Sequence, residues 1–488
     1  MMTLEKLTAE ICSVSGPWKD LEVTGITSDS REVQKGNLFI AVTGPKQDGG
    51  RFIDDAIRRG AAVVVSSAEK EDIPENVCFL RVADTKDFLQ KAAVRFFDDP
   101  SAKVRTIGVT GTNGKTTVAF LLESILQAAG KPCGVIGTIN HRFGGEVFES
   151  KNTTPGIIQN LSYLNQMARR KIPYCVMEVS SHALAQDRAA GIDFAYAVFT
   201  NLTSDHMDYH SDQEDYFLAK SKLFTGLGTD AAALINQDDA FSGRLIGMTE
   251  CNVKTYGVKN SADLQVLDLK ADLNGSRFVL SADQRNIDIS TGLIGLHNVY
   301  NIASACGVAL QENIPVDKIL TGVRNLTTVP GRLEPVEAGQ DFHVFVDYAH
   351  TEDALRNVLS SLRNVSSSKI ILVFGCGGDR DREKRPLMGK TAGDLADMVI
   401  VTNDNPRSED PQAIADQVVS GLETDDYRMI LDRKEAICEA MSLARPGDTV
   451  LIAGKGHEDY QIFRDKTISF DDRAVAHECL KSQKVKKS

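Results

Sequence analysis

Short apolar runs alternate with amphipathic stretches along most of the chain. Runs rich in Val, Ile and Ala, typical of buried strands, occupy residues 37–42, 61–66, 106–110, 174–179, 197–202 and 232–236. Helical patterns lie between such runs, for example at residues 51–60. This alternation predicts an α/β protein with mainly parallel sheets and crossover helices.

Two segments depart from that pattern. Residues 264–290 alternate polar and apolar positions, which predicts a more β-like insert. Residues 1–11 have the pattern of an amphipathic helix. Turn-rich stretches near Pro100 and around Gly331 predict boundaries, and hence three domains at residues 1–100, 101–331 and 332–488.

The last third repeats one theme three times. Apolar runs at residues 370–374, 398–402 and 449–453 each lead into a loop rich in Gly, Asp, Asn, Arg or His. Because ligands of open α/β sheets bind outside the carboxyl ends of strands, these loops predict one composite site. After the second loop, Asp410 and Pro411 have the pattern of a helix N-cap and first helical residue.

Composition narrows the choice of partners. The 488 residues carry a formal net charge of -12, and outside the KVKK tail no long basic run occurs, which argues against nucleic acid as the main partner. No signal peptide or membrane span is recognisable, so we expect a cytoplasmic protein. The nine cysteines show no C-x-x-C pair, and we expect reduced core cysteines.

The segment TIGVTGTNGKTTVAFLLESIL has the pattern of a phosphate-binding loop between a strand and a helix. Glycines let backbone N–H groups approach phosphate oxygens, and the helix N-terminus favours negative charge. Lys115 can reach the terminal phosphates and the Thr116 hydroxyl can bind Mg²⁺. Val109 replaces the first glycine of the general pattern, so a plain Gly-rich turn is the alternative. A dinucleotide fingerprint fails, because Arg380 stands where its last glycine is required.

Ten motifs then occur in a fixed order: GTNGKTT, KNTTPG, MEVSSHAL, FTNLTSDHMDYH, GLHNVYN, PGRLEPV, DYAHTEDAL, GCGGDRDREKRP, DNPRSEDP and AGKGHEDYQ. Together they resemble the Mur ligases, the ATP-dependent amide-forming enzymes of peptidoglycan precursor synthesis. The resemblance covers nearly the whole chain. It implies an N-terminal α/β domain for the UDP-substrate, a central P-loop ATPase with a mainly parallel sheet, and a C-terminal Rossmann-like domain.

The resemblance also implies a reaction. ATP phosphorylates a carboxylate of UDP-MurNAc-L-Ala-D-Glu, and the amine of meso-diaminopimelate attacks the acyl phosphate. Two Mg²⁺ ions, a monomeric enzyme and no nucleic-acid or membrane partner are expected. The matching metal ligands are Thr116, Glu178, His206 and Lys220, the last as a carbamate formed from CO₂. By pattern alone, His206 would be a turn residue and Lys220 a solvated surface lysine.

The motifs assign further residues. ATP is expected to contact Gly111, Thr112, Asn113, Gly114, Lys115, Thr116, Thr117, Asn298, Asn301, Arg332 and Asp347. Catalytic roles are expected for Lys115, carbamylated Lys220, Arg332 and His350; Arg332 could instead form an interdomain salt bridge. In DYAHTEDAL, Glu352 replaces the usual proline, which predicts a small change at a helix start.

Two more sets complete the expected site. The UDP-substrate matches Ser28, Ser30, Pro45, Lys46, Gln47, Asn152, Thr153, Thr154, Ser180, Gln186 and Arg188. Many relatives have His near Pro45 and Lys46, and the SDSR segment could be a simple turn. Diaminopimelate matches Arg380, Asp404, Asn405, Pro406, Arg407, Gly454 and Glu458.

Two alternatives to this function stay open. The same fold and reaction could add L-lysine, although Arg407 favours diaminopimelate because its guanidinium can bind the second carboxylate, which lysine lacks. The other alternative is a P-loop regulatory NTPase that uses its C-terminal domain to bind partner proteins. It would hydrolyse ATP regardless of either substrate.

Overall fold

The computed structural model describes residues 1–44, 48–203, 205, 207 and 209–487, with side chains up to residue 482. The chain forms two compact units, which are described separately: residues 1–108 with 132–195, and residues 109–131 with 196–488. The chain passes between them three times: within β7 (Arg105–Thr110), between Lys131 and Pro132, and within β12 (Phe194–Phe199). The predicted limits of three domains stay predictions.

The first unit is an α/β structure. Its strands are β1 (Met2–Thr3), β2 (Glu22–Val23), β3 (Gly25–Thr27), β4 (Asn37–Ile40), β5 (Val63–Ser66), β6 (Cys78–Arg81), β8 (Cys133–Ile136), β9 (Asn140–Phe143), β10 (Glu146–Glu149) and β11 (Tyr174–Glu178). Its helices are α1 (Leu4–Thr8), α2 (Ile53–Arg58), α3 (Thr85–Phe96), α5 (Ile157–Arg169) and α6 (Ser181–Ala185).

The predicted alternation at the start of this unit forms a parallel sheet. Strands β3, β4, β5 and β6 pair in sequence order, and all three pairings are parallel. Phe39 and Val64 from the sheet pack with Ile53 and Ala56 of α2. The helix predicted over residues 1–11 is shorter than expected: α1 has five residues, because β1 precedes it and pairs with β2.

The second unit contains the rest of the elements. Its strands, after β12, are β13 (Ala232–Asn236), β14 (Asn252–Gly257), β15 (Leu264–Asp272), β16 (Gly275–Ala282), β17 (Arg285–Thr291), β18 (Glu334–Pro335), β19 (His343–Asp347), β20 (Ile370–Phe374), β21 (Met398–Val401), β22 (Tyr427–Met429), β23 (Thr449–Ala453), β24 (Tyr460–Ile462) and β25 (Thr467–Ser469). Its helices are α4 (Lys115–Ala128), α7 (Gln213–Thr225), α8 (Ser242–Gly247), α9 (Leu296–Gln311), α10 (Val316–Asn325), α11 (Glu352–Val365), α12 (Lys384–Leu395), α13 (Pro411–Val419), α14 (Arg433–Leu443) and α15 (Asp472–Lys487).

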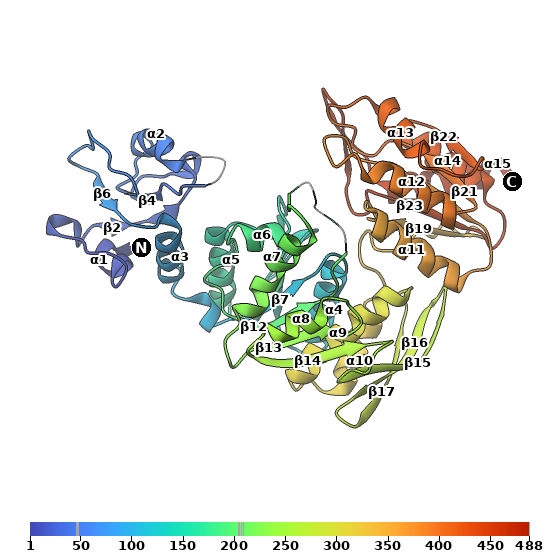
Figure 1. Cartoon of the computed structure of the whole chain (residues 1–488), viewed down its shortest axis with the longest axis horizontal. Coiled ribbons are helices and arrows are strands. Elements are labelled where there is room, and N and C mark those ends of the chain that lie inside the picture. The colour runs from blue at the N-terminus through green and yellow to red at the C-terminus, as the bar shows by residue number, and fades with distance from the viewer. Residues whose placement is uncertain (45–47, 204, 206, 208, 488) are drawn as a thin grey trace. The chain divides into compact units, whose positions relative to one another are not determined.

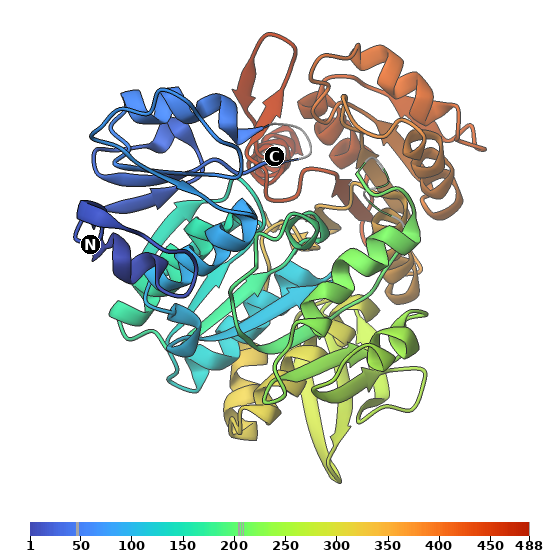
Figure 2. The ribbon, with the colours of Figure 1, turned by 60° about the vertical axis from the view of Figure 1, so that its left-hand side comes forward.

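The insert predicted at residues 264–290 is β-structured. Strands β12, β13, β14 and β15 pair in parallel, and β15, β16 and β17 then pair antiparallel. Figure 2 shows β15–β17 in yellow-green as one long antiparallel ribbon. Alternation of polar and apolar residues fits strands that bury only one face.

The three apolar runs of the last third form the centre of a six-stranded sheet, ordered β18-β19-β23-β20-β21-β22. Alternate residues face opposite sides, so Leu372 packs in one core with α11, α12 and α13, while Val373 packs in another with α14 and α15 (Figure 1). Helices on both faces explain why these strands are almost continuously apolar, with Thr449 the one polar residue among them. The central pairings are parallel, so their carboxyl ends share one edge.

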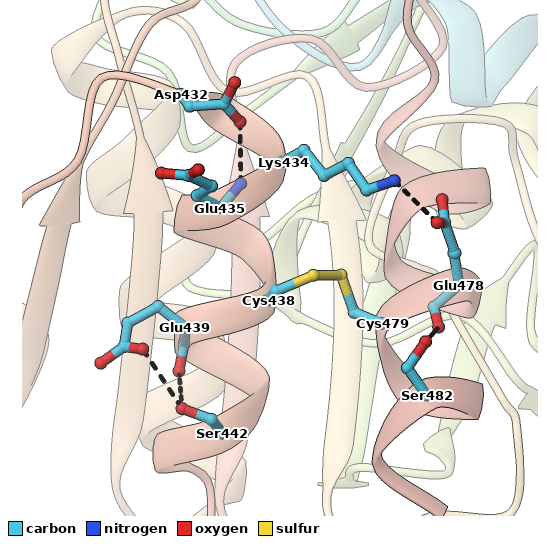
Figure 3. Close-up of a disulfide and its surroundings, with 9 residues drawn as sticks. All are labelled: Asp432, Lys434, Glu435, Cys438, Glu439, Ser442, Glu478, Cys479 and Ser482. Atoms are coloured by element: carbon cyan, nitrogen blue, oxygen red, sulfur yellow. Dashed lines mark hydrogen bonds and ion pairs between the residues drawn. A yellow bond between two sulfur atoms is a disulfide. The ribbon is translucent and has the colours of Figure 1, made fainter. Parts of the chain in front are cut away.

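The expectation that all cysteines are reduced is wrong for two of them. Cys438 of α14 and Cys479 of α15 form a disulfide, drawn in Figure 3 beside the ion pair of Lys434 and Glu478. The two cysteines are 41 positions apart, and they meet only because both helices pack on the same face of the sheet. The spacing of the cysteines along the chain does not indicate that these two form a pair.

Reduction of this disulfide is expected to lower the free energy of unfolding by about 2–4 kcal/mol, because the reduced chain regains entropy when it unfolds. Denaturant titration with and without a reductant measures the difference. The Cys438→Ser variant is the control, since a reductant should not change its unfolding midpoint. An equal shift in that variant would show that another cysteine is responsible.

Candidate active site

The predicted phosphate-binding loop connects β7 to α4. Gly111 has a φ of 143° and Gly114 a φ of 92°, conformations that favour glycine. A Cβ atom at residue 114 would lie 2.4 Å from the Asn301 Oδ1 atom of α9. The structure thus brings Asn301 against the loop, and Asn301 Nδ2 donates to Asn298 Oδ1 at 3.1 Å.

Two lysines converge on one carbonyl of this loop. Lys115 Nζ donates to Gly111 O and Thr112 O, both at 2.8 Å, and Lys220 Nζ donates to Gly111 O at 2.9 Å. The surface position that pattern alone gives Lys220 is wrong, since this residue of α7 is 2% exposed. Burial and, secondarily, the charge of Lys115 hold the pKa of Lys220 well below its usual value.

Arg332 lies beside the start of α4, and Asp347 contacts the segment that carries it. Arg332 Nη2 donates to Thr116 Oγ1 at 3.4 Å, and its guanidinium lies 4.7 Å from the centre of the Tyr348 ring. Asp347 is buried and accepts backbone N–H groups of Leu333 and Ala349 at 2.6 and 2.8 Å. Burial raises the pKa of this carboxyl. Asp347 therefore fixes the segments that carry Arg332 and His350.

The segment after Asp347 contributes two more groups. Burial and the charge of Lys384 lower the pKa of His350, and its Nδ1 lies 2.7 Å from Tyr348 O. Asp353, which the sequence did not single out, accepts from Asn113 Nδ2 at 2.9 Å. The carboxylate thus touches the phosphate-binding loop. Helix α11 begins at Glu352, with Thr351 as its N-cap, so Glu352 is the first residue of this helix.

The first unit contains a cavity of about 870 Å³. Ser28, Asn152, Gln186 and Arg188 of the expected UDP-substrate set line it. Lys86 and His141, which the sequence analysis missed, also line it. Burial lowers the pKa of His141 to about 4, so it is neutral at pH 7. Its lining carries amides, hydroxyls and both charges, with carboxylates such as Asp29, Asp84 and Asp187 beside the cations Lys86, Lys151 and Arg188, so it suits a large polar ligand with many hydrogen-bonding groups.

The other expected residues of this set lie elsewhere. Thr154 Oγ1 donates to Glu178 O at 2.8 Å and accepts from Ser180 N at 3.0 Å, whereas Thr153 Oγ1 lies 3.1 Å from Thr138 Oγ1. Ser30 is buried in a turn. Ser30, Thr153, Thr154 and Ser180 do not line the cavity. Pro45, Lys46, Gln47 and His206 lie outside the described residues.

The loops after β20, β21 and β23 meet, as the shared strand edge predicted. Gly378 N donates to Asn405 O at 2.9 Å, and Arg407 Nη1 donates to Gly378 O at 2.8 Å. Asn405 Nδ2 donates to Glu458 Oε2 at 3.0 Å. The first contacts join the loops that follow β20 and β21, and the last joins the loops that follow β21 and β23. The composite cluster is thus present.

Two groups in this cluster are set up to receive a ligand. Arg407 has a φ of 51°, a left-handed conformation that costs energy outside glycine and is common at ligand clamps. Asp404 is 7% exposed and its Oδ1 atom has no hydrogen-bond partner in the described part of the chain. Gly454 keeps this carboxylate in place, because a Cβ there would lie 3.1 Å from Asp404 Oδ2. Pro406, which stands between Asp404 and Arg407 in the sequence, is buried, whereas Arg380 is exposed.

Of the expected metal ligands, Glu178 and Thr116 offer oxygen atoms, and Lys220 would do so only as a carbamate. Glu178 is buried and accepts from Thr138 N at 2.9 Å and Thr138 Oγ1 at 2.8 Å. Thr116 and Lys220 belong to the second unit, and the described residues hold no group of three or more His, Cys, Asp or Glu placed for a metal. Carboxylate, hydroxyl and carbamate oxygens are each of the hard type that Mg²⁺ prefers. Within the same residues, no helix has the length and apolar character needed to span a membrane.

Comparison with known proteins gives a consistent result. The family model described as Mur ligase family, catalytic domain matches residues 22–97; the Mur ligase middle domain matches 109–309; and the Mur ligase, glutamate ligase domain matches 331–456. A relative from Syntrophomonas wolfei named UDP-N-acetylmuramoyl-L-alanyl-D-glutamate--2,6-diaminopimelate ligase is 44% identical over 98% of both chains.

Solved structures agree in fold. One described as the structure of UDP-N-acetylmuramoyl-L-alanyl-D-glutamate--2,6-diaminopimelate ligase has a TM-score of 0.72, 33% identity and 99% coverage of both chains. MurF ligase from Thermotoga maritima, solved in complex with ADP, has a TM-score of 0.62 at 21% identity, covering 95% of this chain and 97% of its own. Sequence, motifs and fold lead to one conclusion: the chain belongs to the Mur ligase family.

Proposed function

We propose that this protein is an ATP-dependent ligase that adds meso-2,6-diaminopimelate to UDP-MurNAc-L-Ala-D-Glu, in the cytoplasm and as a monomer. The observation that carries the proposal is a pair of oppositely charged groups at the end of β21: the guanidinium of Arg407, in a turn with a left-handed φ, and the buried carboxylate of Asp404, whose Oδ1 accepts no hydrogen bond within the described residues and lies 3.5 Å from Lys455 Nζ. Each end of diaminopimelate carries a carboxylate and an ammonium on one carbon atom. These two groups match the guanidinium of Arg407 and the carboxylate of Asp404. The name of the Syntrophomonas relative supports the same substrates.

ATP is assigned to the loop between β7 and α4. The N–H groups of the loop and the ammonium of Lys115 would hold its phosphates. Arg332, beside the Thr116 hydroxyl, would stabilise the charge that develops as the terminal phosphoryl moves to the substrate carboxylate. Asn298, Asn301 and Asp347 would keep these groups in place. Mg²⁺, held by Thr116, Glu178, His206 and modified Lys220, would supply further neutralisation of phosphate charge.

Lys220 is assigned the role of a carbamate. Its amine is buried, and burial holds its pKa well below the usual value, which favours the unprotonated amine that can add to CO₂. The product is an anion next to the phosphate-binding loop, where an ammonium would repel divalent cations. The interaction with Gly111 O points the amine toward that loop.

The nucleotide substrate is assigned to the cavity of the first unit. Arg188 is held there by Gln186 Oε1, which accepts from its Nε at 3.0 Å, and by Thr154 O, which accepts from its Nη1 at 3.2 Å. A guanidinium fixed in this way suits recognition of a carboxylate or phosphate. Thr153, Thr154 and Ser180 would support the peptide-bearing part through the Glu178 segment.

Discrimination between diaminopimelate and lysine is assigned to Arg407. Lysine has no second carboxylate, so its binding would leave a desolvated guanidinium without its partner. His350, whose pKa is lowered by burial, would assist as a proton acceptor when the amine attacks the acyl phosphate. The amide then forms as phosphate leaves.

The Arg407→Ala variant is expected to raise the KM for diaminopimelate roughly 100-fold, since a charge-assisted bidentate contact is lost. The KM for ATP should change little. Steady-state ADP release with varied diaminopimelate and varied ATP measures both constants.

Arg324→Ala is the matched control, because this exposed arginine lies on α10. Its constants should equal those of the unchanged protein. A collapse of ATP affinity in Arg407→Ala, with the diaminopimelate KM unaltered, would place the amino-acid pocket elsewhere.

A further inference from the structure

A second lysine is buried in the amino-acid cluster. Lys455, which follows Gly454 in the loop after β23, is 0% exposed. Its Nζ lies 3.0 Å from Glu458 Oε2, 3.2 Å from Asn405 Oδ1 and 3.5 Å from Asp404 Oδ1. One ammonium therefore contacts three of the side chains assigned to the amino-acid pocket. Removing a charge completely from water is costly unless it is paired, so these contacts are required for the lysine to stay charged.

The amide of Asn405 takes a single orientation in this cluster. Its Oδ1 accepts from Lys455 Nζ and from Ile462 N at 3.0 Å, and its Nδ2 donates to Glu458 Oε2 at 3.0 Å. Without Lys455, the amide loses a cationic donor and Glu458 loses its ion pair. The lysine thus fixes both the amide and the carboxylate.

The charges of the cluster balance. Asp404 and Glu458 contribute two negative charges, and Lys455 and Arg407 contribute two positive ones, so the four side chains together are neutral. Arg380 is left out of this sum because it is exposed and solvent screens its charge. A neutral set is suited to a neutral group with separated charges, which the far end of diaminopimelate has: one ammonium and one carboxylate. The side-chain ammonium of lysine carries a net positive charge instead.

We propose that Lys455 is a positioning and specificity residue, which holds Asp404, Asn405 and Glu458 and neutralises one of the two carboxylates, so that the pocket accepts a zwitterionic end and disfavours a lone ammonium. The proposal rests on the proposed function, because it takes the amino-acid pocket to lie at this cluster. Lys455 acts through its neighbours.

The test compares Lys455→Gln and Lys455→Met with the unchanged protein, with ADP release measured for diaminopimelate and for L-lysine. Glutamine retains a donor for Asn405 but has no charge. We expect the KM for diaminopimelate to rise roughly 10- to 100-fold in both variants, as for loss of one partner from a buried ion pair. The KM for ATP should stay within about twofold. The ratio of kcat/KM for diaminopimelate to that for lysine should fall about tenfold or more, since each 1.4 kcal/mol is a factor of ten.

A second substitution separates charge from packing. Adding Glu458→Gln to Lys455→Gln removes one negative charge and makes the remaining pair neutral again, so the preference for diaminopimelate over lysine should partly return. A lysine with a purely structural role predicts the opposite, namely further loss with no recovery of preference. Lys434→Met, which breaks an exposed ion pair on α14, is the matched control and should leave both constants unchanged.

The outcomes distinguish failure of the role proposed for Lys455 from failure of the proposed function. An unchanged diaminopimelate-to-lysine ratio in folded Lys455→Gln would overturn the proposal, and so would failure of both single variants to fold, since Lys455 would then serve folding alone. If the unchanged protein releases no ADP with diaminopimelate, the proposed function itself fails. The two failures are thus distinguishable.

Discussion

Replacing Lys220 with alanine is expected to lower kcat by roughly 10²- to 10³-fold, the usual cost of losing one charge-stabilising group in a preorganised site. The side chain is buried beside the phosphate-binding loop, and its amine contacts Gly111 O. Alanine removes the carbamate that the proposed function places there. Single-turnover formation of ADP with both other substrates present measures the loss.

Chemical rescue distinguishes a carbamate from a merely structural lysine. Small carboxylates such as acetate or formate can enter the space left in Lys220→Ala and replace the missing anion, so we expect activity to rise with their concentration. Lys222→Ala, exposed two residues along α7, is the control and should neither lose activity nor respond. Folded Lys220→Ala that stays inactive at all carboxylate concentrations would argue against the carbamate.

The second large effect is expected for Lys115→Met. In the unchanged protein the Lys115 ammonium lies 2.8 Å from Gly111 O and from Thr112 O. Methionine keeps much of the side-chain volume but removes this ammonium. Phosphate charge in the transition state would lose a neutralising partner, so kcat/KM for ATP should fall roughly 10²- to 10³-fold. Steady-state kinetics with varied ATP measures this ratio.

The matched control for this variant is Lys318→Met, in an exposed ion pair with Asp317 on α10. Its kcat/KM for ATP should be unchanged. Because the amino-acid cluster makes no use of Lys115, the KM for diaminopimelate should also stay constant in Lys115→Met. A large rise in that KM with normal ATP kinetics would remove Lys115 from the ATP site.

Much of the fold could be predicted because apolar periodicity reflects burial directly. The runs at residues 232–236, 370–374 and 449–453 are strands with the predicted limits, and Asp410 caps α13 as its side chain accepts from Gln412 N. The N-terminal helix is shorter than predicted, because pairing of β1 with β2 outweighs the helical pattern of the first residues.

The site could be predicted in part. Strand ends that share a sheet edge brought Asn405 and Glu458 together as expected. Lys455 and Asp353 were missed because a lone lysine after glycine, or an acid in the first turn of a helix, has the pattern of a solvent-exposed side chain. Their significance comes from neighbours 50 and 240 positions away, Asn405 and Asn113, which periodicity does not reveal. The Cys438–Cys479 bond was missed for the same reason.

The most direct test of the central claim measures ADP release with ATP and UDP-MurNAc-L-Ala-D-Glu in the presence of meso-diaminopimelate, of L-lysine, or of neither. We expect release that requires both the nucleotide dipeptide and diaminopimelate, with lysine a poor substitute. Release that depends on lysine would contradict the assignment of Arg407, and release that is indifferent to every acceptor would indicate a regulatory NTPase instead.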